Sequence, residues 1–233
     1  MSQSKLSDLS VAVVGGGIAG AVAALMLGRL GARVTLFEQV PEPRAVGAGI
    51  LLQPTGLAVL RAIDEGIEAE LEGARIVQLL GHTPSGRVVL DSQYRFWREG
   101  SYGLGIHRGA LFDALRRRLR GLPNVTVRTG VTVVRVEQSE LGTVLFDGED
   151  NFSKCDVVVL AEGVNSKLRG QLNIPYSAKP YPWGAFYAIL PSVASLPQDV
   201  LLQRYEAARK MTGFADGFIW WAGDEQFVLE RAS

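Results

Sequence analysis

The chain has 233 residues, 47% of them hydrophobic, and its 24 basic residues balance 24 acidic ones. This balance argues against nucleic acid or an anionic membrane as a main partner, and no apolar run is long enough to cross a membrane. Cys155 is the only cysteine and His82 and His107 are far apart, so neither a disulfide nor a metal site is expected. The opening residues MSQSKLSDLS lack the features of a secretory signal, and we expect a cytoplasmic protein.

The first predicted elements form a strand–helix–strand unit. Residues 11–14 (VAVV) are apolar on both faces, as in a strand buried within a parallel sheet. Apolar residues then recur at helical spacing until Gly31, and residues 33–38 (RVTLFE) are the next strand. Two parallel neighbouring strands need such a crossover, so the pattern predicts a βαβ unit.

Three glycines lie between this strand and helix with the spacing G-x-G-x-x-G. Gly15 allows a tight turn, Gly17 lets the backbone approach a pyrophosphate, and Gly20 lets the helix pack closely on the strand. Glu38 ends the second strand, where a carboxylate accepts hydrogen bonds from the ribose hydroxyls of an adenosine. A turn that binds no ligand is the alternative, but it gives no reason for a carboxylate at the end of the second strand. The motif predicts a dinucleotide site and leaves NAD and FAD open.

The rest of the chain has patterns that predict further helices and strands. Its amino-acid composition changes after residue 175. Prolines and alternating aromatic residues begin there, which places a domain boundary at 175/176. The basic run RRRLR (116–120) is expected on a solvated helix face. The predicted helices are 54–63, 65–72 and one through 111–119; the predicted strands are 75–82, 87–91, 102–106, 125–128, 131–138, 143–147 and a buried one, CDVVVLAEG, at 155–163.

Four stretches carry a family resemblance: the βαβ unit with LFEQVPEPR, GAGILLQPTGLAVLRAI (47–63), IHRGALFDALRRRL (106–119) and CDVVVLAEGVNSKLR (155–169). In this order they resemble the FAD-dependent aromatic hydroxylases of the para-hydroxybenzoate hydroxylase type, which are class A flavoprotein monooxygenases. The resemblance implies an α/β fold with a Rossmann-like FAD-binding domain (GR2-type) at 1–175, including an inserted strand region at about 75–105. Residues 176–233 would then begin a mixed β-sheet substrate domain.

The resemblance also implies a cofactor site. The glycines would hold the FAD pyrophosphate, Glu38 the adenosine ribose, Arg44 the flavin edge, and Arg108 the phosphate or ribitol region. Ordinary surface ion pairs are the alternative for both arginines. The residues that the resemblance assigns to cofactor binding are Gly15, Gly17, Ile18, Ala19, Gly20, Glu38, Gln39, Arg44, Gly49, Arg108, Glu162 and Gly163.

The implied activity is hydroxylation of an aromatic or related electron-rich small molecule by FAD and O2, with NADH or NADPH as a transient reductant. No catalytic residue is assigned. Seven aromatic residues near the C-terminus are candidates either for the substrate pocket or for the core of the sheet: Tyr181, Trp183, Phe186, Tyr187, Phe218, Trp220 and Trp221.

Two departures from the family pattern stand out. Glu162 replaces the usual aspartate, and the family's third fingerprint, a Gly-Asp followed by small residues and histidine, is missing. Gly223-Asp224 is instead predicted as a hairpin turn. We therefore expect a fragment, or a second chain that supplies the C-terminal part. The alternatives are a non-catalytic FAD-binding subunit, a halogenase or isoprenoid reductase of the same fold, and a less favoured NAD-dependent dehydrogenase.

Overall fold

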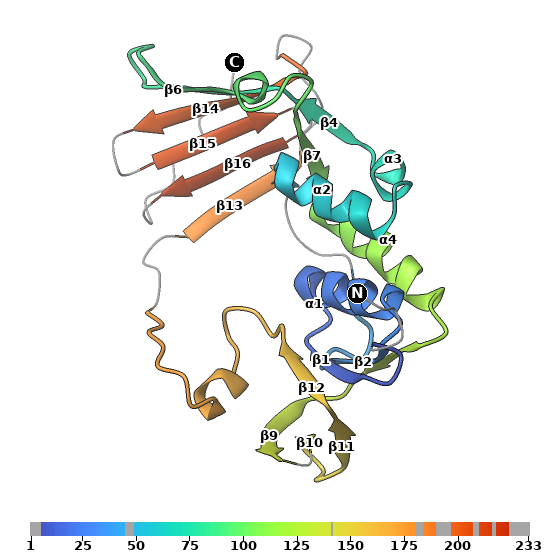
Figure 1. Cartoon of the computed structure of the whole chain (residues 1–233). Helices are drawn as coiled ribbons and strands as arrows, with labels where there is room; N and C mark the ends of the chain where they lie inside the picture. The colour runs from blue at the N-terminus through green and yellow to red at the C-terminus, as the bar shows by residue number, and fades with distance from the viewer. Residues whose placement is uncertain are drawn as a thin grey trace. The chain divides into compact units, whose positions relative to one another are not determined.

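The computed structural model describes residues 6–44, 49–140, 142–179, 184–189, 197–206, 210–215 and 218–223 (Figure 1). The chain divides into two compact units that each draw on separate stretches of sequence. Unit 1 contains Met1–Val46, Ala62–Glu70 and Gly109–Tyr176, and unit 2 contains Gly47–Arg61, Leu71–Arg108 and Ser177–Ser233. The assignment of residues 1–175 and 176–233 to cofactor and substrate domains stays a prediction.

A four-stranded parallel sheet forms the centre of unit 1. Its strand order is β12-β1-β2-β8, and each neighbouring pair is parallel. The predicted βαβ unit is confirmed, because α1 connects β1 and β2 and packs against both. The strands are β1 (Ser10–Val14), β2 (Arg33–Glu38), β8 (Val125–Thr129) and β12 (Val157–Leu160), and the helices of this unit include α1 (Ile18–Arg29), α3 (Ile67–Glu70) and most of α4 (Arg108–Arg120).

A three-stranded antiparallel sheet packs on this parallel sheet. Its order is β11-β10-β9, built from β9 (Val133–Ser139), β10 (Gly142–Asp147) and β11 (Phe152–Cys155). Ala12, Val14 and Phe37 of the parallel sheet share one buried cluster with residues of this smaller sheet and with Leu168 of the 3-10 helix η3 (Leu168–Gln171). Successive strand residues face opposite sides of a sheet, so Val11 and Val13 face away from the smaller sheet.

The single buried strand predicted at 155–163 is wrong in two respects. The segment divides at Asp156 into β11 and β12, which belong to different sheets. The Asp156 carboxylate accepts hydrogen bonds from the Ser10 backbone N–H and hydroxyl, both at 2.7 Å, and these contacts hold the chain where it changes sheet. β12 is also an edge strand whose Val157 is 41% exposed, so it is not buried on both sides.

Unit 2 contains a six-stranded mixed sheet of order β13-β16-β15-β14-β5-β6, in which only the β14–β5 pair is parallel. The predicted strand 75–82 breaks at Val77, because its two halves join different sheets. A smaller sheet has the order β3-β7-β4. The elements of unit 2 are β3 (Gly49–Leu52), α2 (Pro54–Ile63), β4 (Gly73–Ile76), β5 (Gln78–His82), β6 (Val88–Gln93), η2 (Tyr94–Phe96), β7 (Gly103–His107), β13 (Gly184–Ile189), β14 (Val200–Glu206), β15 (Lys210–Ala215) and β16 (Phe218–Gly223). The last two residues of α2 belong to unit 1.

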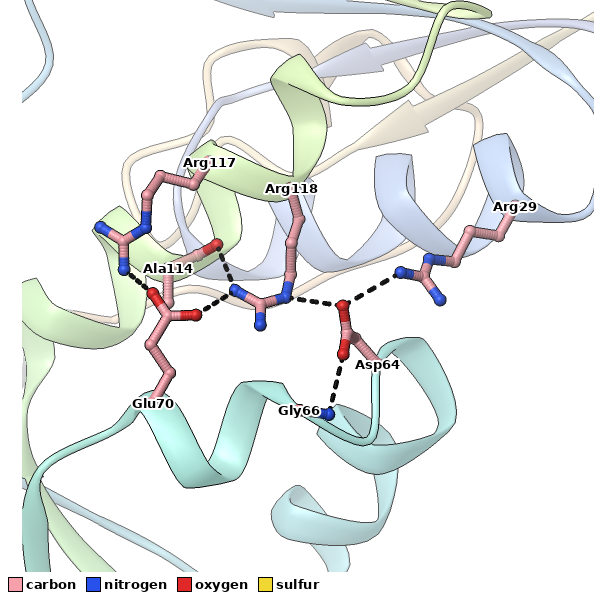
Figure 2. A network of polar contacts seen from close by, with 7 residues as sticks. All are labelled: Arg29, Asp64, Gly66, Glu70, Ala114, Arg117 and Arg118. Atoms are coloured by element: carbon pink, nitrogen blue, oxygen red, sulfur yellow. Dashed lines mark hydrogen bonds and ion pairs between the residues drawn. The ribbon is translucent and has the colours of Figure 1, made fainter.

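In the basic run of α4, predicted on a solvated face, Arg117 and Arg120 are exposed, whereas Arg118 is largely buried in an ion-pair network (Figure 2). The Arg118 side chain is only 15% exposed and lies between Asp64 and Glu70, with N–O distances of 3.0 and 2.7 Å. Arg117 also pairs with Glu70, and Arg29 of α1 pairs with Asp64 at 3.3 Å. The network joins α1, the segment around α3, and α4, all within unit 1. The Gly66 N–H and Arg118 lower the pKa of Asp64, and Arg118 and Arg117 lower that of Glu70.

Replacing Arg118 by methionine should lower the free energy of unfolding by about 1–3 kcal/mol at neutral pH, because two carboxylates lose their best-buried partner. Carboxylates with lowered pKa stabilise the fold above their ordinary pKa values, here 3.8 for Asp64 and 4.5 for Glu70. That stability is lost as the pH falls through the folded-state values, so the difference between wild type and variant should shrink below about pH 4.5.

Urea denaturation across this pH range measures both effects. Arg117→Gln is the control, because that side chain is 55% exposed and its loss should cost less than about 1 kcal/mol. Equal losses for the two variants would contradict the central place of Arg118.

Candidate cofactor-binding site

The glycine turn brings three chain segments of unit 1 into close contact. The Gly15 N–H donates to the Phe37 carbonyl at 2.8 Å, and Gly15 has a φ of +103°. A Cβ on Gly15 would lie 2.5 Å from the Ala161 carbonyl oxygen, and one on Gly20 would lie 1.8 Å from the Gly15 carbonyl oxygen. Only glycine fits at these two positions, so β1, α1 and the end of β12 can meet here.

The N-terminus of α1 opens from this turn towards solvent. Gly17 is the N-cap residue, and no side-chain hydrogen bond caps the helix within the described part of the chain. Gly17 and Ala19 are exposed, and a Cβ on Gly17 would meet nothing within 4 Å. Uncapped N–H groups and the positive end of the helix dipole favour an anion, and pyrophosphate is the anion that this motif serves in dinucleotide-binding folds.

Glu38 is fixed beside the same turn. Its Oε2 accepts a hydrogen bond from the Gly16 N–H at 2.7 Å, and its Oε1 accepts one from the Val40 N–H at 2.8 Å. A carboxylate has about four acceptor positions, so two remain for hydroxyl donors. The half-buried Glu38 is therefore oriented before any ribose arrives and keeps the capacity to bind one.

A small hollow lies next to Glu38 in unit 1. Arg116 Nη1 donates to the Pro43 carbonyl at 2.5 Å, and its guanidinium lies 5.4 Å from the centre of the Phe112 ring. Arg116 thereby ties the segment after Glu38 to α4. The hollow is lined by Gly16, Leu36, Glu38, Pro43, Phe112, Arg116, Leu119, Arg120, Val127 and Thr129.

The loop after β12 is held by its own polar contacts. The Ser166 hydroxyl donates to Glu162 Oε2 at 2.5 Å, and the Arg169 N–H donates to the Ser166 hydroxyl at 3.2 Å. Arg169 Nη2 also donates to the carbonyls of Gly163 and Val164, at 3.0 and 3.3 Å. The extra methylene of glutamate at 162 still allows its carboxylate to reach a partner within this loop.

The predicted cofactor residues fall into two groups. Unit 1 brings together the glycine turn, Glu38, Gln39 and the loop of Glu162 and Gly163. Arg44 also belongs to unit 1, but its side chain is 81% exposed and pairs with Glu42 at 3.5 Å, as in a surface ion pair. Gly49 and Arg108 belong to unit 2. There they lie close together, because Gly49 pairs with His107 across β3 and β7.

Sequence reasoning missed several residues that hold this site. Gly16 and Val40 orient Glu38 through backbone N–H groups, and no pattern of side chains signals such contacts. Ser166 and Arg169 had a signal, since they form the Ser-x-x-Arg part of the 155–169 stretch. The sequence predicts Arg116 on a solvated helix face, and only the position of α4 reveals its hydrogen bond to the Pro43 carbonyl.

Several sequence predictions concern residues at the C-terminal end. Tyr181, Trp183 and Asp224 lie outside the described residues. The backbones of Phe186 and Tyr187 pair with those of Trp221 and Trp220 between β13 and β16.

Among the described residues, no group of three or more His, Cys, Asp or Glu side chains could hold a metal ion. No helix in this described part of the chain is both long and apolar enough to span a membrane.

Comparison with known proteins identifies the class to which this fold and site belong. The chain is a member of the FAD binding domain family, whose sequence profile matches residues 8–215. This match resolves the choice between NAD and FAD that the glycine motif left open, and it confirms the predicted Rossmann-like α/β fold.

The curated relatives include proteins named as monooxygenases. The chain is 34% identical over 221 residues to a probable 2-heptyl-3-hydroxy-4(1H)-quinolone synthase of Rhodococcus erythropolis, with 88% of this chain and 53% of the relative covered. It is 31% identical over 229 residues to 6-hydroxynicotinate 3-monooxygenase of Pseudomonas fluorescens, with 94% and 57% covered. The chain thus spans just over half the length of these curated relatives.

Solved structures show the same fold. The tetrameric form of 2-methyl-3-hydroxypyridine-5-carboxylic acid oxygenase matches with a TM-score of 0.77 at 23% identity, covering 92% of this chain and 58% of that one. CtdE in complex with FAD and a substrate matches with a TM-score of 0.74 at 20% identity, covering 97% and 59%. At this level of identity the likeness establishes the fold.

Gly17→Ala should fold like the wild type but bind FAD at least about tenfold more weakly, because its methyl group would stand where the pyrophosphate approaches. Gly20→Ala should instead lower the melting temperature, because its Cβ would lie 1.8 Å from a carbonyl oxygen. Thermal unfolding and FAD titration of both variants separate the two roles. Wild-type FAD affinity in a well-folded Gly17→Ala variant would contradict pyrophosphate binding at this turn.

Proposed function

We propose that the protein is an FAD-dependent monooxygenase that hydroxylates an aromatic or related electron-rich small molecule with NAD(P)H and O2. The observation that carries this proposal is the open N-terminus of α1 beside a pre-oriented Glu38, in a chain of the FAD binding domain family. The printed names of the relatives, a hydroxyquinolone synthase and a hydroxynicotinate monooxygenase, support the aromatic substrate class. We place the enzyme in the cytoplasm, where NADH and NADPH are available.

The chain's own residues would bind and orient the cofactor. The N–H groups of Gly17, Ile18 and Ala19 would face the pyrophosphate, and Glu38 would accept hydrogen bonds from the adenosine ribose. Gly163 would pass close to FAD, in a loop that Ser166 and Arg169 hold in place. When bound, FAD would supply electron transfer from the nicotinamide and the activation of O2.

We also propose Arg44, Gly49 and Arg108 as cofactor-binding residues. An exposed guanidinium at the start of a thirteen-residue helix suits a phosphate, which supports Arg108. Arg44 is free to leave its surface partner Glu42, since exposed ion pairs contribute only about 0–1 kcal/mol. Arg44 could therefore turn towards an anionic cofactor at little cost.

A second candidate is an FAD-binding subunit whose activity needs another chain. The chain spans 53–57% of these relatives' own length, so both candidates are tested on the chain itself. Under this reading the chain would bind FAD but would not oxidise NAD(P)H by itself.

One experiment separates these candidates. Purified chain is mixed with FAD, and its visible absorbance is followed together with NADPH and NADH oxidation and O2 consumption, using 6-hydroxynicotinate and 3-hydroxybenzoate as test substrates. Bound flavin with a product that has gained one oxygen atom supports the monooxygenase. Bound flavin without NAD(P)H oxidation supports the subunit, and failure to bind flavin contradicts both.

Glu38→Gln should weaken FAD binding by about tenfold, because one acceptor oxygen becomes a donor that cannot receive a ribose hydroxyl. Glu38→Arg should weaken it further, since the acceptors disappear altogether. FAD titration by fluorescence quenching measures both. The control is Glu140→Gln, which changes an exposed carboxylate just after β9. FAD affinity that is unchanged in both Glu38 variants would remove Glu38 from the site.

A further inference from the structure

A second hollow in unit 1, of about 350 Å³, lies where the strands of the parallel sheet begin. It is bordered by the first residues of β1 and β2, by the segment that leads into β8, and by β11. We call it the amino-end hollow. Gly15 and Glu38 stand at the opposite, carboxyl ends of β1 and β2, so the amino-end hollow is separate from the cofactor site. Its volume falls in the range of about 300–1,000 Å³ that small-molecule sites occupy.

Two threonine hydroxyls lie side by side on the floor of the amino-end hollow. Thr35 of β2 is in register with Ala12 of β1 and with Thr126 of β8, so all three share the sheet face that packs on the smaller sheet. Neither threonine hydroxyl forms a hydrogen bond with another described residue. Every buried side-chain nitrogen and oxygen in the described part of the chain has a partner, so these two hydroxyls are open to solvent.

The smaller sheet supplies a third hydroxyl at the wall of the amino-end hollow. Cys155 of β11 belongs to the buried cluster between the two sheets, and Ser153 lies two residues earlier on the same face of the strand. Ser153 is half-buried, borders the hollow, and forms no side-chain hydrogen bond with a described residue. Hydroxyls from both sheets therefore face one space.

Asn124 adds a hydrogen-bond acceptor whose position is fixed. Its Nδ2 donates to the carbonyls of Gly28 and Ala32, both at 2.7 Å. These two bonds use both amide hydrogens, so Oδ1 is the part of this side chain that is left to receive a donor. Asn124 borders the amino-end hollow and is held in place before any ligand arrives.

The charges around the amino-end hollow offset each other. Arg33 is the charged residue of its lining, and Arg33 Nη2 donates to the Asp8 carbonyl at 3.2 Å. The hydrogen bonds from Ser10 and the charge of Arg33 lower the pKa of Asp156, so this carboxylate is ionised at neutral pH and balances Arg33. Burial raises the pKa of the Cys155 thiol, which stays neutral. A charged ligand would therefore find no unbalanced opposite charge here.

The lining suits one kind of molecule. Hydroxyls both donate and accept hydrogen bonds, so Thr35, Thr126 and Ser153 match the alcohol groups of a ligand in either direction. Phe37 and Pro123 add apolar surface to the same lining. A saturated ring that carries hydroxyls at its edge and C–H groups on its faces can meet both kinds of surface.

We propose that the amino-end hollow binds a neutral, polyhydroxylated small molecule, such as a sugar or a cyclitol. The proposal goes beyond the monooxygenase function and does not depend on it, because the hollow lies at the opposite end of the strands from the cofactor residues. The hydroxyls of Thr35, Thr126 and Ser153 and the Asn124 carboxamide oxygen bind the ligand's alcohol groups.

The test titrates the purified chain with myo-inositol, a neutral ring with six hydroxyls, and follows backbone amide shifts by NMR. The shifts should concentrate at the starts of β1, β2 and β8 and in β11. Cyclohexanol has the same ring with a single hydroxyl and should bind at least about tenfold more weakly. Inorganic phosphate tests the charge argument and should bind more weakly than myo-inositol.

Thr126→Val and Ser153→Ala should each weaken myo-inositol binding by about three- to tenfold, because each removes one hydroxyl and adds no bulk. The double variant Thr35→Val/Thr126→Val should weaken it by at least about tenfold. Thr132→Val is the matched control, because Thr132 is an exposed threonine of the same unit outside the hollow. Melting temperatures show that each variant is folded.

Three results would overturn the inference: no binding of myo-inositol up to about 50 mM, equal affinity for cyclohexanol or phosphate, or unchanged affinity in the folded hydroxyl variants. The titration is repeated with FAD present. Because the two sites are separate, FAD should change the affinity for myo-inositol by less than about twofold, and competition by FAD would place the ring at the glycine turn instead. Failure to bind FAD in these samples contradicts the proposed function and leaves the myo-inositol result to be judged by itself.

Discussion

Backbone crowding at the start of α1 is the constraint on which the rest of unit 1 depends. Gly20 lies against the Gly15 carbonyl, and Gly15 lies against Ala161 at the end of β12. A side chain at either glycine would push these segments apart. Because they meet, the loop after β12 lies beside an open helix N-terminus. The geometry that leaves the helix N-terminus open therefore also brings the loop after β12 beside it.

Polar contacts hold the loops around this turn. Glu38 binds two backbone N–H groups, Arg116 binds the Pro43 carbonyl, and Ser166 binds Glu162. The Glu38–Gly16 and Arg116–Pro43 contacts join different segments, and the Ser166–Glu162 bond lies within the loop after β12. Groups held in this way lose little conformational freedom when a ligand binds, which favours affinity. The Arg118 network links α1, the segment around α3 and α4 of the same unit.

Buried polar side chains find partners in both units. In unit 1, Arg118 is satisfied on both sides by carboxylates. In unit 2, the Tyr205 hydroxyl donates a hydrogen bond to Gln203 Oε1, and Gln203 is only 8% exposed. No buried side-chain nitrogen or oxygen among the described residues lacks a hydrogen-bond partner, and satisfied polar groups of this kind stabilise a fold.

Local patterns in the sequence were sufficient for many of the elements. The strand at 33–38 and the helix at 54–63 have the predicted bounds, because side-chain periodicity is a property of neighbouring residues. The division of 155–163 was not predictable in this way. It depends on Asp156 and Ser10, which are 146 positions apart in the chain.

The sequence by itself determined the glycine spacing, the carboxylate at the end of the second strand, and hence a dinucleotide site. These features act over a single βαβ unit, whose geometry is nearly the same wherever it occurs. Only the tertiary structure decided that Arg118 is buried, that β5 joins β14, and that Gln203 meets Tyr205. Burial and pairing depend on which distant segments come into contact, and the cost of removing a polar group from water becomes visible only when its neighbours are known.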